Sequence, residues 1–291
     1  MTSRLVMRGM IGFYLLVFFG YLFGPLIVMG VTAFNTPSYP QAYPFEGFTL
    51  HWFAVLAADK DVIYGLQNSL RIGVLVVLVS VPCGLAGAIV MQQVYARARS
   101  FYYLVVVSPV LTPGVIIGIS TVIFWRDFTG ITGTRSFLYD GLVLCVLGQS
   151  SYISAYCMLI FLSRLQRFDH ALEEAGLDLG ASNAQVFRHI LIPFLRPAIL
   201  SASVLAFLSS FENYNTTTFA ILADKTLTTV LAGRVRQGST PALSALAVTI
   251  IGVTVLATIV YEVLKRREDA RRVAKLRTAE AAERQELVAA A

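Results

Sequence analysis

Four polar side chains interrupt a long apolar stretch late in the chain: Glu212, Asn213, Tyr214 and Asn215. An ionisable side chain inside a bilayer is unfavourable unless it faces water, a partner or a ligand. We therefore expect Glu212 to bind a cation or to line its path, with the three following residues beside it. If the stretch is helical, Glu212, Asn215 and Thr216 share one face, with Phe219 a turn further. Alternatively, Glu212 and its amide neighbours form hydrogen bonds to another helix, or lie near the outer end of a short span.

Other kinds of chemistry find little support. The chain has no glycine-rich phosphate loop ending in Gly-Lys-Ser or Gly-Lys-Thr, so we expect no ATP hydrolysis by that route. His51, His170 and His189 stand at no ligand spacing, and no Ser-His-Asp or Cys-His arrangement is suggested. The three cysteines lie in apolar runs and indicate neither a disulfide framework nor a metal site. We expect no catalytic residue, no metal and no cofactor on this chain, which argues against an enzyme.

Composition places the chain in a membrane. Of 291 residues, 56% are hydrophobic and 14% charged, and the mean hydropathy is +0.70. The net charge of +6 does not indicate a nucleic-acid partner, because the basic residues gather in loops between apolar runs. A span needs roughly 20 apolar residues. Six such runs can be drawn, at about 9–34, 66–91, 101–125, 141–162, 195–222 and 241–264. We predict an all-α polytopic membrane protein whose first run is a retained span rather than a signal peptide.

The basic residues are distributed unequally between the two sets of loops. One set carries Arg4, Arg8, Arg97, Arg99, Arg164, Arg167, Arg188, Arg196 and the basic tail from Lys265 to Arg284. The other set carries Lys60, Arg126, Arg135, Lys225, Arg234 and Arg236, several of them beside Asp59, Asp61, Asp127 or Asp224. An even number of spans puts both termini on one side, and the positive-inside bias makes that side the cytoplasm.

Prolines mark two further segments. Pro109 and Pro113 open the third run and free backbone carbonyls inside the bilayer, which predicts a bent helix that lines a path or, alternatively, a kinked packing helix. The first outer loop, from Asn35 to about Ile63, combines prolines with many aromatic residues. The prolines predict no regular helix in its first part. The aromatic residues suit either a membrane-interface belt or contact with an external partner protein.

A charged stretch between the fourth and fifth runs has clear helix boundaries. Asp169 can cap a helix that runs from His170 to about Leu179, and Gly180 would end it. Ser182 and Gln185 form a capping box that begins a second short helix, which we expect to end before Pro193. The spacing predicts two short amphipathic helices at the membrane surface.

This stretch resembles the loop motif of the inner-membrane permease subunits of ATP-binding-cassette importers, written Glu-Ala-Ala, three residues, Gly, nine residues, Ile, one residue, Leu-Pro. Glu174-Ala175-Gly176, Gly180 and Ile190-Leu191-Ile192-Pro193 match its spacing, with Gly176 in place of Ala and Ile192 in place of Leu. Gly176 should loosen the first helix by up to about 1 kcal/mol relative to Ala.

Further segments resemble the C-type permease of spermidine/putrescine importers over about residues 67–265. They are Ser108-Pro109, Ser163-Arg164-Leu165, Phe168-Asp169, Glu174-Ala175, Asp178-Leu179-Gly180-Ala181 and Pro241-Ala242-Leu243-Ser244-Ala245-Leu246. Those permeases carry an acidic pair in the fifth span, of which only Glu212 is present here.

The resemblance implies a type I importer permease fold with a cytoplasmic coupling helix at about residues 170–192. It implies an ATPase-docking role for five residues: Glu174, Ala175, Asp178, Gly180 and Ala181. Implied partners are a cytoplasmic ATPase dimer that binds ATP and Mg, a second related permease, and a periplasmic or lipid-anchored solute-binding protein. The implied function is import of a polyamine or a related solute across the bacterial inner membrane.

Along the chain, we expect a first helix and periplasmic loop at 1–63, a core permease domain at 64–264 and a cytoplasmic tail at 265–291, a helix that frays into disorder. Two other functions stay open from the residues alone. A proton-coupled carrier would use Glu212 as its titrating group. A membrane scaffold would bind a partner without transporting a solute.

Overall fold

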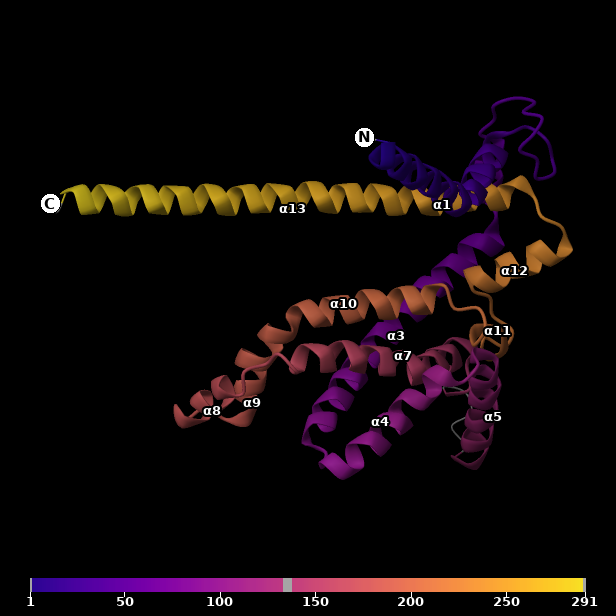
Figure 1. The fold of residues 1–291 in the computed structure, drawn as a ribbon. Helices are drawn as coiled ribbons and strands as arrows, with labels where there is room; N and C mark the ends of the chain where they lie inside the picture. Colours follow the sequence, from indigo (N-terminus) through magenta and orange to yellow (C-terminus); the bar gives the residue numbers. More distant parts are fainter. Residues whose placement is uncertain (1, 133–137, 290–291) are drawn as a thin grey trace. The chain divides into compact units, whose positions relative to one another are not determined.

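The computed structural model describes residues 2–132 and 138–289, and within them all regular elements are helices (Figure 1). Arg135, assigned above to the outer loops, lies outside the described residues. The helices are α1 (Thr2–Phe34), α2 (His51–Ala58), α3 (Lys60–Gln93), α4 (Ala96–Leu111), α5 (Gly114–Thr132), α7 (Gly141–Leu165), α8 (Ala171–Asp178), α9 (Asn183–Val186), the π-helical η1 (Phe187–Leu191), α10 (Ile192–Phe211), α11 (Thr217–Ala220), α12 (Leu227–Gln237) and α13 (Pro241–Ala289).

Six helical segments of the described chain are long and apolar enough to cross a membrane. They are Val6–Phe34, Lys60–Gln93, Gly114–Ile131, Gly141–Leu165, Asn183–Phe211 and Pro241–Arg267. The predicted all-α, six-span architecture is therefore confirmed. The side chains of Asp59 and Asp140 accept hydrogen bonds from first-turn N–H groups and so begin α3 and α7.

The third predicted span, 101–125, is wrong as a single helix, because the chain divides into α4 and α5 within it. Pro109 is accommodated inside α4, but Thr112, which precedes Pro113, is extended at φ −84° and ψ 131°. A residue before proline disfavours the helical region, so the first helix ends there. The carbonyl of Pro113 then accepts from the N–H groups of Ile116 and Ile117 and begins α5.

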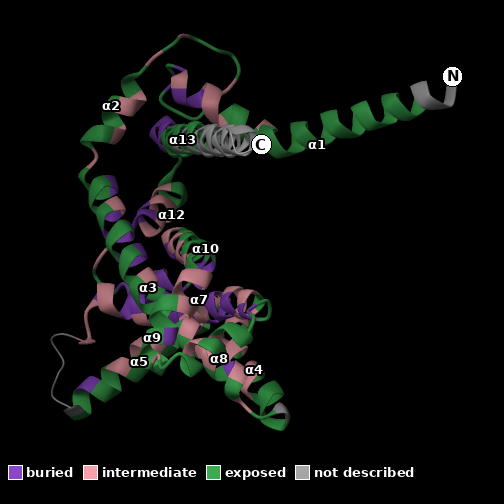
Figure 2. Cartoon of the chain, turned by 90° about the vertical axis from the view of Figure 1, so that its left-hand side faces the viewer, coloured by how far each residue is buried: buried purple, intermediate pink, exposed green. Residues whose placement is uncertain are grey.

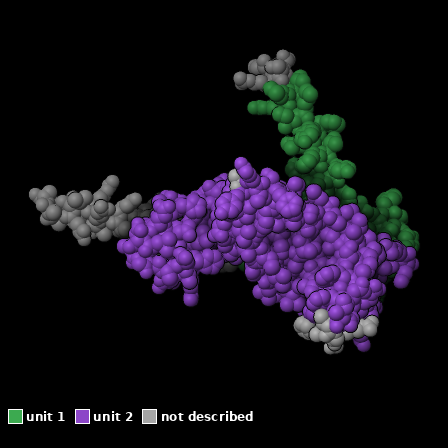
Figure 3. All heavy atoms as spheres, turned by 90° about the horizontal axis from the view of Figure 1, so that it is seen from below, with its two compact units in different colours: residues 1–58, 238–291 green, residues 59–237 purple. Residues whose placement is uncertain are grey.

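The chain forms two compact units, residues 1–58 with 238–291 and residues 59–237 (Figure 3). In the second unit α3, α7 and α10 pack on one another, and buried residues lie along these helices (Figure 2). Phe161 and Leu195 are fully buried members of this core. A Cβ atom added at Gly84 of α3 would lie 2.5 Å from Cys157 Cβ and 2.8 Å from the carbonyl oxygen of Ser154. The small residue lets α3 and α7 approach closely.

In the first unit, α1 and α2 each pack against α13. The loop after α1 is organised by Asn35, which is buried. Its Nδ2 donates to the carbonyls of Gln41 and Pro44, and its Oδ1 accepts from the N–H of Glu46. The Trp52 indole donates to the Asn35 carbonyl at 2.8 Å. These bonds order the segment without a helix before α2, as its prolines predict.

Four aromatic side chains of this loop are exposed: Tyr39, Tyr43, Phe45 and Phe48. Phe48 also stacks on Phe34, with ring centroids 5.3 Å apart. Exposure suits both a membrane-interface belt and contact with an external partner, so both interpretations stay predictions.

The close approach at Gly84 predicts the effect of adding one methyl group. Gly84→Ala should destabilise the protein by about 1–3 kcal/mol, because the nearest atoms belong to a Cβ and to backbone that cannot easily move. Thermal unfolding of the purified protein in detergent measures this. Gly20→Ala in α1 is the matched control, since nothing lies within 4 Å of a Cβ there. Equal unfolding temperatures for the two variants would contradict the prediction.

Candidate functional site

The charged stretch after α7 has several of the helix boundaries that its residues predict. α8 begins at Ala171, one residue later than predicted, with His170 as its N-cap residue, and the Asp169 carboxylate accepts from the N–H of Ala171 at 3.0 Å. Gly180 adopts φ +84°, a conformation that side chains disfavour, and ends α8. The N–H of Gly180 donates to the Leu177 carbonyl and that of Ala181 to the Gly176 carbonyl, which is the Schellman pattern. The capping box of Ser182 and Gln185 is present.

The prediction that the second short helix ends before Pro193 is wrong. α9 continues through the π-helical η1 into α10, and Pro193 lies in the first turn of α10. Proline lacks an N–H and its ring clashes with the carbonyl four residues earlier. The wider π turn lies immediately before the proline, where Ile192 N–H reaches back to the Phe187 carbonyl. The helical path is therefore continuous across a residue that usually ends one.

The residues predicted to dock an ATPase lie together on this loop. Glu174, Ala175, Asp178 and Gly180 are exposed, and Ala181 is half-buried. Beside them, Leu179 is 89% exposed. Sequence reasoning missed this leucine as a candidate, although an apolar residue next to Gly180 could have indicated an exposed contact. The loop thus presents acidic and apolar side chains to the solvent without neighbours that cover them.

The loop is attached to the bundle by an aromatic cluster. Phe168 is buried, and its ring centroid lies 5.1 Å from that of Phe194 in the first turn of α10. The Arg164 guanidinium lies over the Phe194 ring, 4.4 Å from its centroid. Within the loop, a Cβ at Gly176 would lie 3.0 Å from Ile190 Cδ1, so glycine lets α8 approach the following segment closely.

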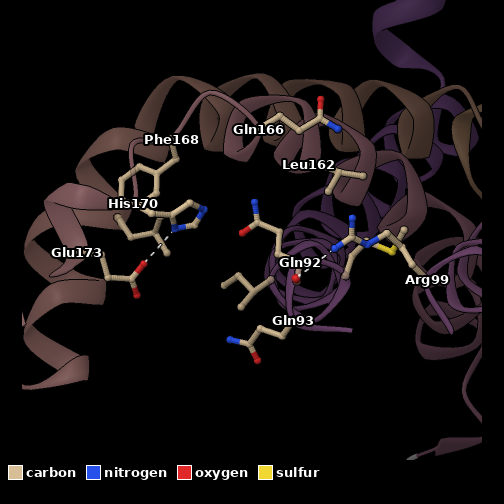
Figure 4. Close-up of a pocket in the computed structure, with 11 residues that line it drawn as sticks. Gln92, Gln93, Arg99, Leu162, Gln166, Phe168, His170 and Glu173 are labelled. Atoms are coloured by element: carbon tan, nitrogen blue, oxygen red, sulfur yellow. Dashed lines mark hydrogen bonds and ion pairs between the residues drawn. The ribbon is translucent and has the colours of Figure 1, made fainter. Parts of the chain in front are cut away.

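A cavity of about 550 Å³ separates α8 from the end of α3 and the start of α4. Gln92, Gln93 and Arg99 line one side, and His170 and Glu173 line the other, joined by a 3.5 Å contact (Figure 4). The loop is therefore held mainly through the ends of α7 and α10.

The second group of predicted residues lies where the fifth predicted span, 195–222, is broken. α10 ends at Phe211, and Glu212 is its C-cap residue. The expected helical face of Glu212, Asn215 and Thr216 is thus wrong, because Asn213 to Thr216 form a turn before α11. The Glu212 side chain is exposed, and no hydrogen bond or ion pair joins it to another described residue.

Asn213 holds this turn together. Its Oδ1 accepts from the N–H groups of Thr216 and Thr217 at 3.1 and 3.2 Å and from the Thr217 hydroxyl at 3.1 Å. Its Nδ2 donates to the Tyr152 hydroxyl of α7. The Thr228 hydroxyl donates to its carbonyl at 3.0 Å. An amide serves here because it can accept and donate at the same time.

A buried amide on α7 extends this network. Gln149 is 1% exposed, and its Nε2 donates to the Thr217 hydroxyl at 2.8 Å. Its Oε1 accepts from the Ser210 hydroxyl of α10. Sequence reasoning missed Gln149 and Tyr152; the signal was a glutamine inside an otherwise apolar span.

The remaining predicted path residues lie on either side of the turn. The Tyr214 hydroxyl accepts from Arg236 of α12 at 2.9 Å. Asn215 is exposed and packs against the start of α5, where a Cβ at Gly114 would lie 3.1 Å from Asn215 Cβ. Among the described residues, no group of three or more His, Cys, Asp or Glu side chains is placed to hold a metal ion.

The structure thus places a loop with exposed acidic residues at one end of the α9–α10 helical path and the Glu212 carboxylate at the other end. Residues 74–269 match the family described as binding-protein-dependent transport system inner membrane component. The chain belongs to this family.

Relatives of this permease span nearly its whole length. It is 27% identical over 261 residues to the putrescine transport system permease protein PotI of Escherichia coli K12, covering 88% of this chain and 91% of that protein. It is 23% identical over 267 residues to the spermidine/putrescine transport system permease protein PotC of the same strain, covering 91% and 96%.

The fold of the permease is shared with a solved transporter. A bacterial ABC transporter that imports the acidic polysaccharide alginate matches with a TM-score of 0.68 at 17% identity, covering 91% of this chain and 98% of that chain. A second structure, of a bacterial alginate ABC transporter in complex with an alginate pentasaccharide-bound periplasmic protein, matches with a TM-score of 0.65 at 18% identity. At this identity the likeness shows the fold.

Two substitutions at Asn213 test whether the turn depends on an acceptor oxygen at this position. Asn213→Ala should lower stability by about 2 kcal/mol, because two backbone N–H groups lose their acceptor. Asn213→Asp should retain most of the stability, since a carboxylate accepts the same bonds and the Tyr152 hydroxyl can turn to donate. Thermal unfolding compares the two. Equal losses would show that the turn does not depend on an acceptor at this position.

Proposed function

We propose that this permease is a subunit of an ATP-driven importer for a polyamine such as putrescine or spermidine, or for a related cationic solute. The observation that carries the proposal is the exposed Glu212 carboxylate, which ends α10 and has no hydrogen-bond or ion-pair partner among the described residues. A carboxylate of this kind attracts a cation. The names of PotI and PotC, which align with nearly the whole chain, support a polyamine.

The proposed partners follow from the family. A cytoplasmic ATPase dimer binds ATP and Mg and docks on Glu174, Ala175, Asp178, Gly180 and Ala181. A second, related permease completes the path, and a periplasmic or lipid-anchored binding protein delivers the solute. The permease lies in the bacterial inner membrane with both termini in the cytoplasm, and its own chain needs no cofactor.

In the proposed mechanism, ATP binding closes the ATPases and displaces the docking loop. The bundle then changes from an inward-open to an outward-open arrangement, which is alternating access between two states. Glu212, Tyr214 and Asn215 contact the passing solute. Asn213 holds the turn that presents them, through its bonds to Thr216 and Thr217.

Solute-stimulated ATP hydrolysis tests the function directly. The permease is co-purified with its neighbouring ATPase, second permease and binding protein in proteoliposomes. Putrescine or spermidine should stimulate hydrolysis, and Glu212→Gln should lower the stimulation about tenfold, because the cation loses a charged partner. The control is Asp127→Asn, an exposed acid on α5 paired with the adjacent Arg126. Stimulation only by anionic or neutral solutes would contradict a polyamine importer. Uptake driven by a proton gradient without ATP would contradict an ATP-driven one.

Substitutions on the loop test the docking role. Glu174→Gln should lower polyamine uptake several-fold while the ATPase subunits keep their own hydrolysis, because the exposed carboxylate faces the partner. Gly180→Ala should do the same, since the left-handed conformation at φ +84° costs an L-residue such as alanine roughly 1–2 kcal/mol. Glu173→Gln is the matched control, because this neighbouring acid faces the cavity beside His170 instead. Uptake at the wild-type rate in both Glu174→Gln and Gly180→Ala would rule out the docking role.

A further inference from the structure

A second cavity, of about 360 Å³, lies where α4 and α5 are separated. It is lined from α4, α5 and α7, and none of its eleven described lining residues is ionisable. Five of its lining side chains carry a hydroxyl group: Ser108, Thr112, Ser120, Thr121 and Ser151. The volume is within the range of small-molecule sites.

Four of these five hydroxyl groups already donate a hydrogen bond to a backbone carbonyl. Ser108 donates to the Val105 carbonyl at 2.8 Å and Thr112 to the Ser108 carbonyl at 3.0 Å. Thr121 and Ser151 likewise donate to carbonyls of their own helices, each at 2.7 Å. A hydroxyl has one hydrogen and two lone pairs. What these four groups offer to a ligand is therefore lone pairs, so each acts as an acceptor.

Two aromatic rings complete the lining. Phe124 and Trp125 pack edge to face, with ring centroids 5.3 Å apart. The face of such a ring attracts a cation. The cavity thus combines acceptor oxygens with two aromatic rings and contains no Lys or Arg among its described lining residues.

The chemistry of this lining selects among ligands. An alkylammonium group carries three N–H donors and no acceptor, so it satisfies the acceptor oxygens and can lie beside an aromatic ring. A carboxylate or phosphate brings only acceptors, and the described lining offers it two side-chain donors, the Trp125 indole N–H and the Ser120 hydroxyl, and no cation. A polyol would need donors as well as acceptors from the wall.

We propose that this cavity is a binding site for primary alkylammonium ions, where the ammonium group of a diamine rests on the hydroxyl oxygens of Thr121 and Ser151 beside Trp125. The proposal rests on the proposed function, and it adds a recognition site without a carboxylate to the one at Glu212. Neutral oxygens hold a cation less tightly than a carboxylate does, which suits a solute that must leave again.

The test uses the complete importer in proteoliposomes and radiolabelled putrescine at subsaturating concentration. Thr121→Val preserves the shape of the side chain but removes the oxygen, so uptake should fall about tenfold. Thr121→Ser preserves the oxygen and should restore uptake to within about twofold of wild type. Ser151→Ala on α7 should lower uptake as Thr121→Val does, which gives a second variant on a different helix.

Thr254→Val is the matched control, because its hydroxyl donates to the Ile250 carbonyl in the same way but lies on α13. Co-purification of each variant with its partner subunits shows that it has assembled. If wild type shows no putrescine uptake, the proposed function fails and this site fails with it. If wild type transports putrescine and Thr121→Val, Thr121→Ser and Ser151→Ala all match it, only the cavity proposal is overturned.

Discussion

A backbone N–H group that leaves a helix inside a membrane protein must find its acceptor within the protein, because lipid offers none. Where α10 ends, the Oδ1 atom of Asn213 supplies that acceptor for both Thr216 and Thr217. Gln149 of α7 then satisfies the Thr217 hydroxyl. The Asn213 amide thus replaces missing helical partners in the turn that follows Glu212. The Asn213 side chain is occupied by these bonds, whereas the Glu212 carboxylate has no hydrogen-bond or ion-pair partner among the described residues.

The break between α4 and α5 packs directly against this turn. A Cβ at Gly118 of α5 would lie 2.6 Å from the Thr216 carbonyl oxygen, and one at Gly148 of α7 would lie 3.1 Å from Thr121 Oγ1. Glycine at both positions lets two irregular segments share one region of the bundle. The two irregular segments therefore contact each other inside the bundle, where protein groups rather than lipid can satisfy backbone outside helices.

Helix caps and helix ends that depend on neighbouring residues can be predicted from the sequence. Hydrogen bonds between residues far apart in the chain cannot. The cap at Asp169, the end at Gly180 and the box at Ser182 each depend on residues within four positions, so their types suffice. The apolar runs predict the approximate positions of the spans, because a membrane-spanning helix needs a continuous run of roughly 20 apolar residues. Apolar content predicts unbroken third and fifth spans. It does not reveal that the chain leaves the helical region at Thr112, before Pro113, or that Asn213 supplies the acceptor for the Thr216 and Thr217 N–H groups where α10 ends. Gln149, more than sixty residues earlier, bonds the hydroxyls of Ser210 and Thr217. Pro193 predicts a helix stop from the sequence, because the π turn that accommodates the proline has no signature in its own residues.

The continuity across Pro193 has a mechanical consequence. From Asn183 to Phe211 the chain is one helical path of 29 residues. At 1.5 Å per residue it is about 43 Å long, longer than the hydrocarbon core of about 30 Å. One end begins at the capping box beside Gly180, and the other meets Glu212. In the proposed mechanism such a path would act as a lever arm: a tilt imposed at the capping-box end would displace the carboxylate at the opposite end, without passing through a flexible loop.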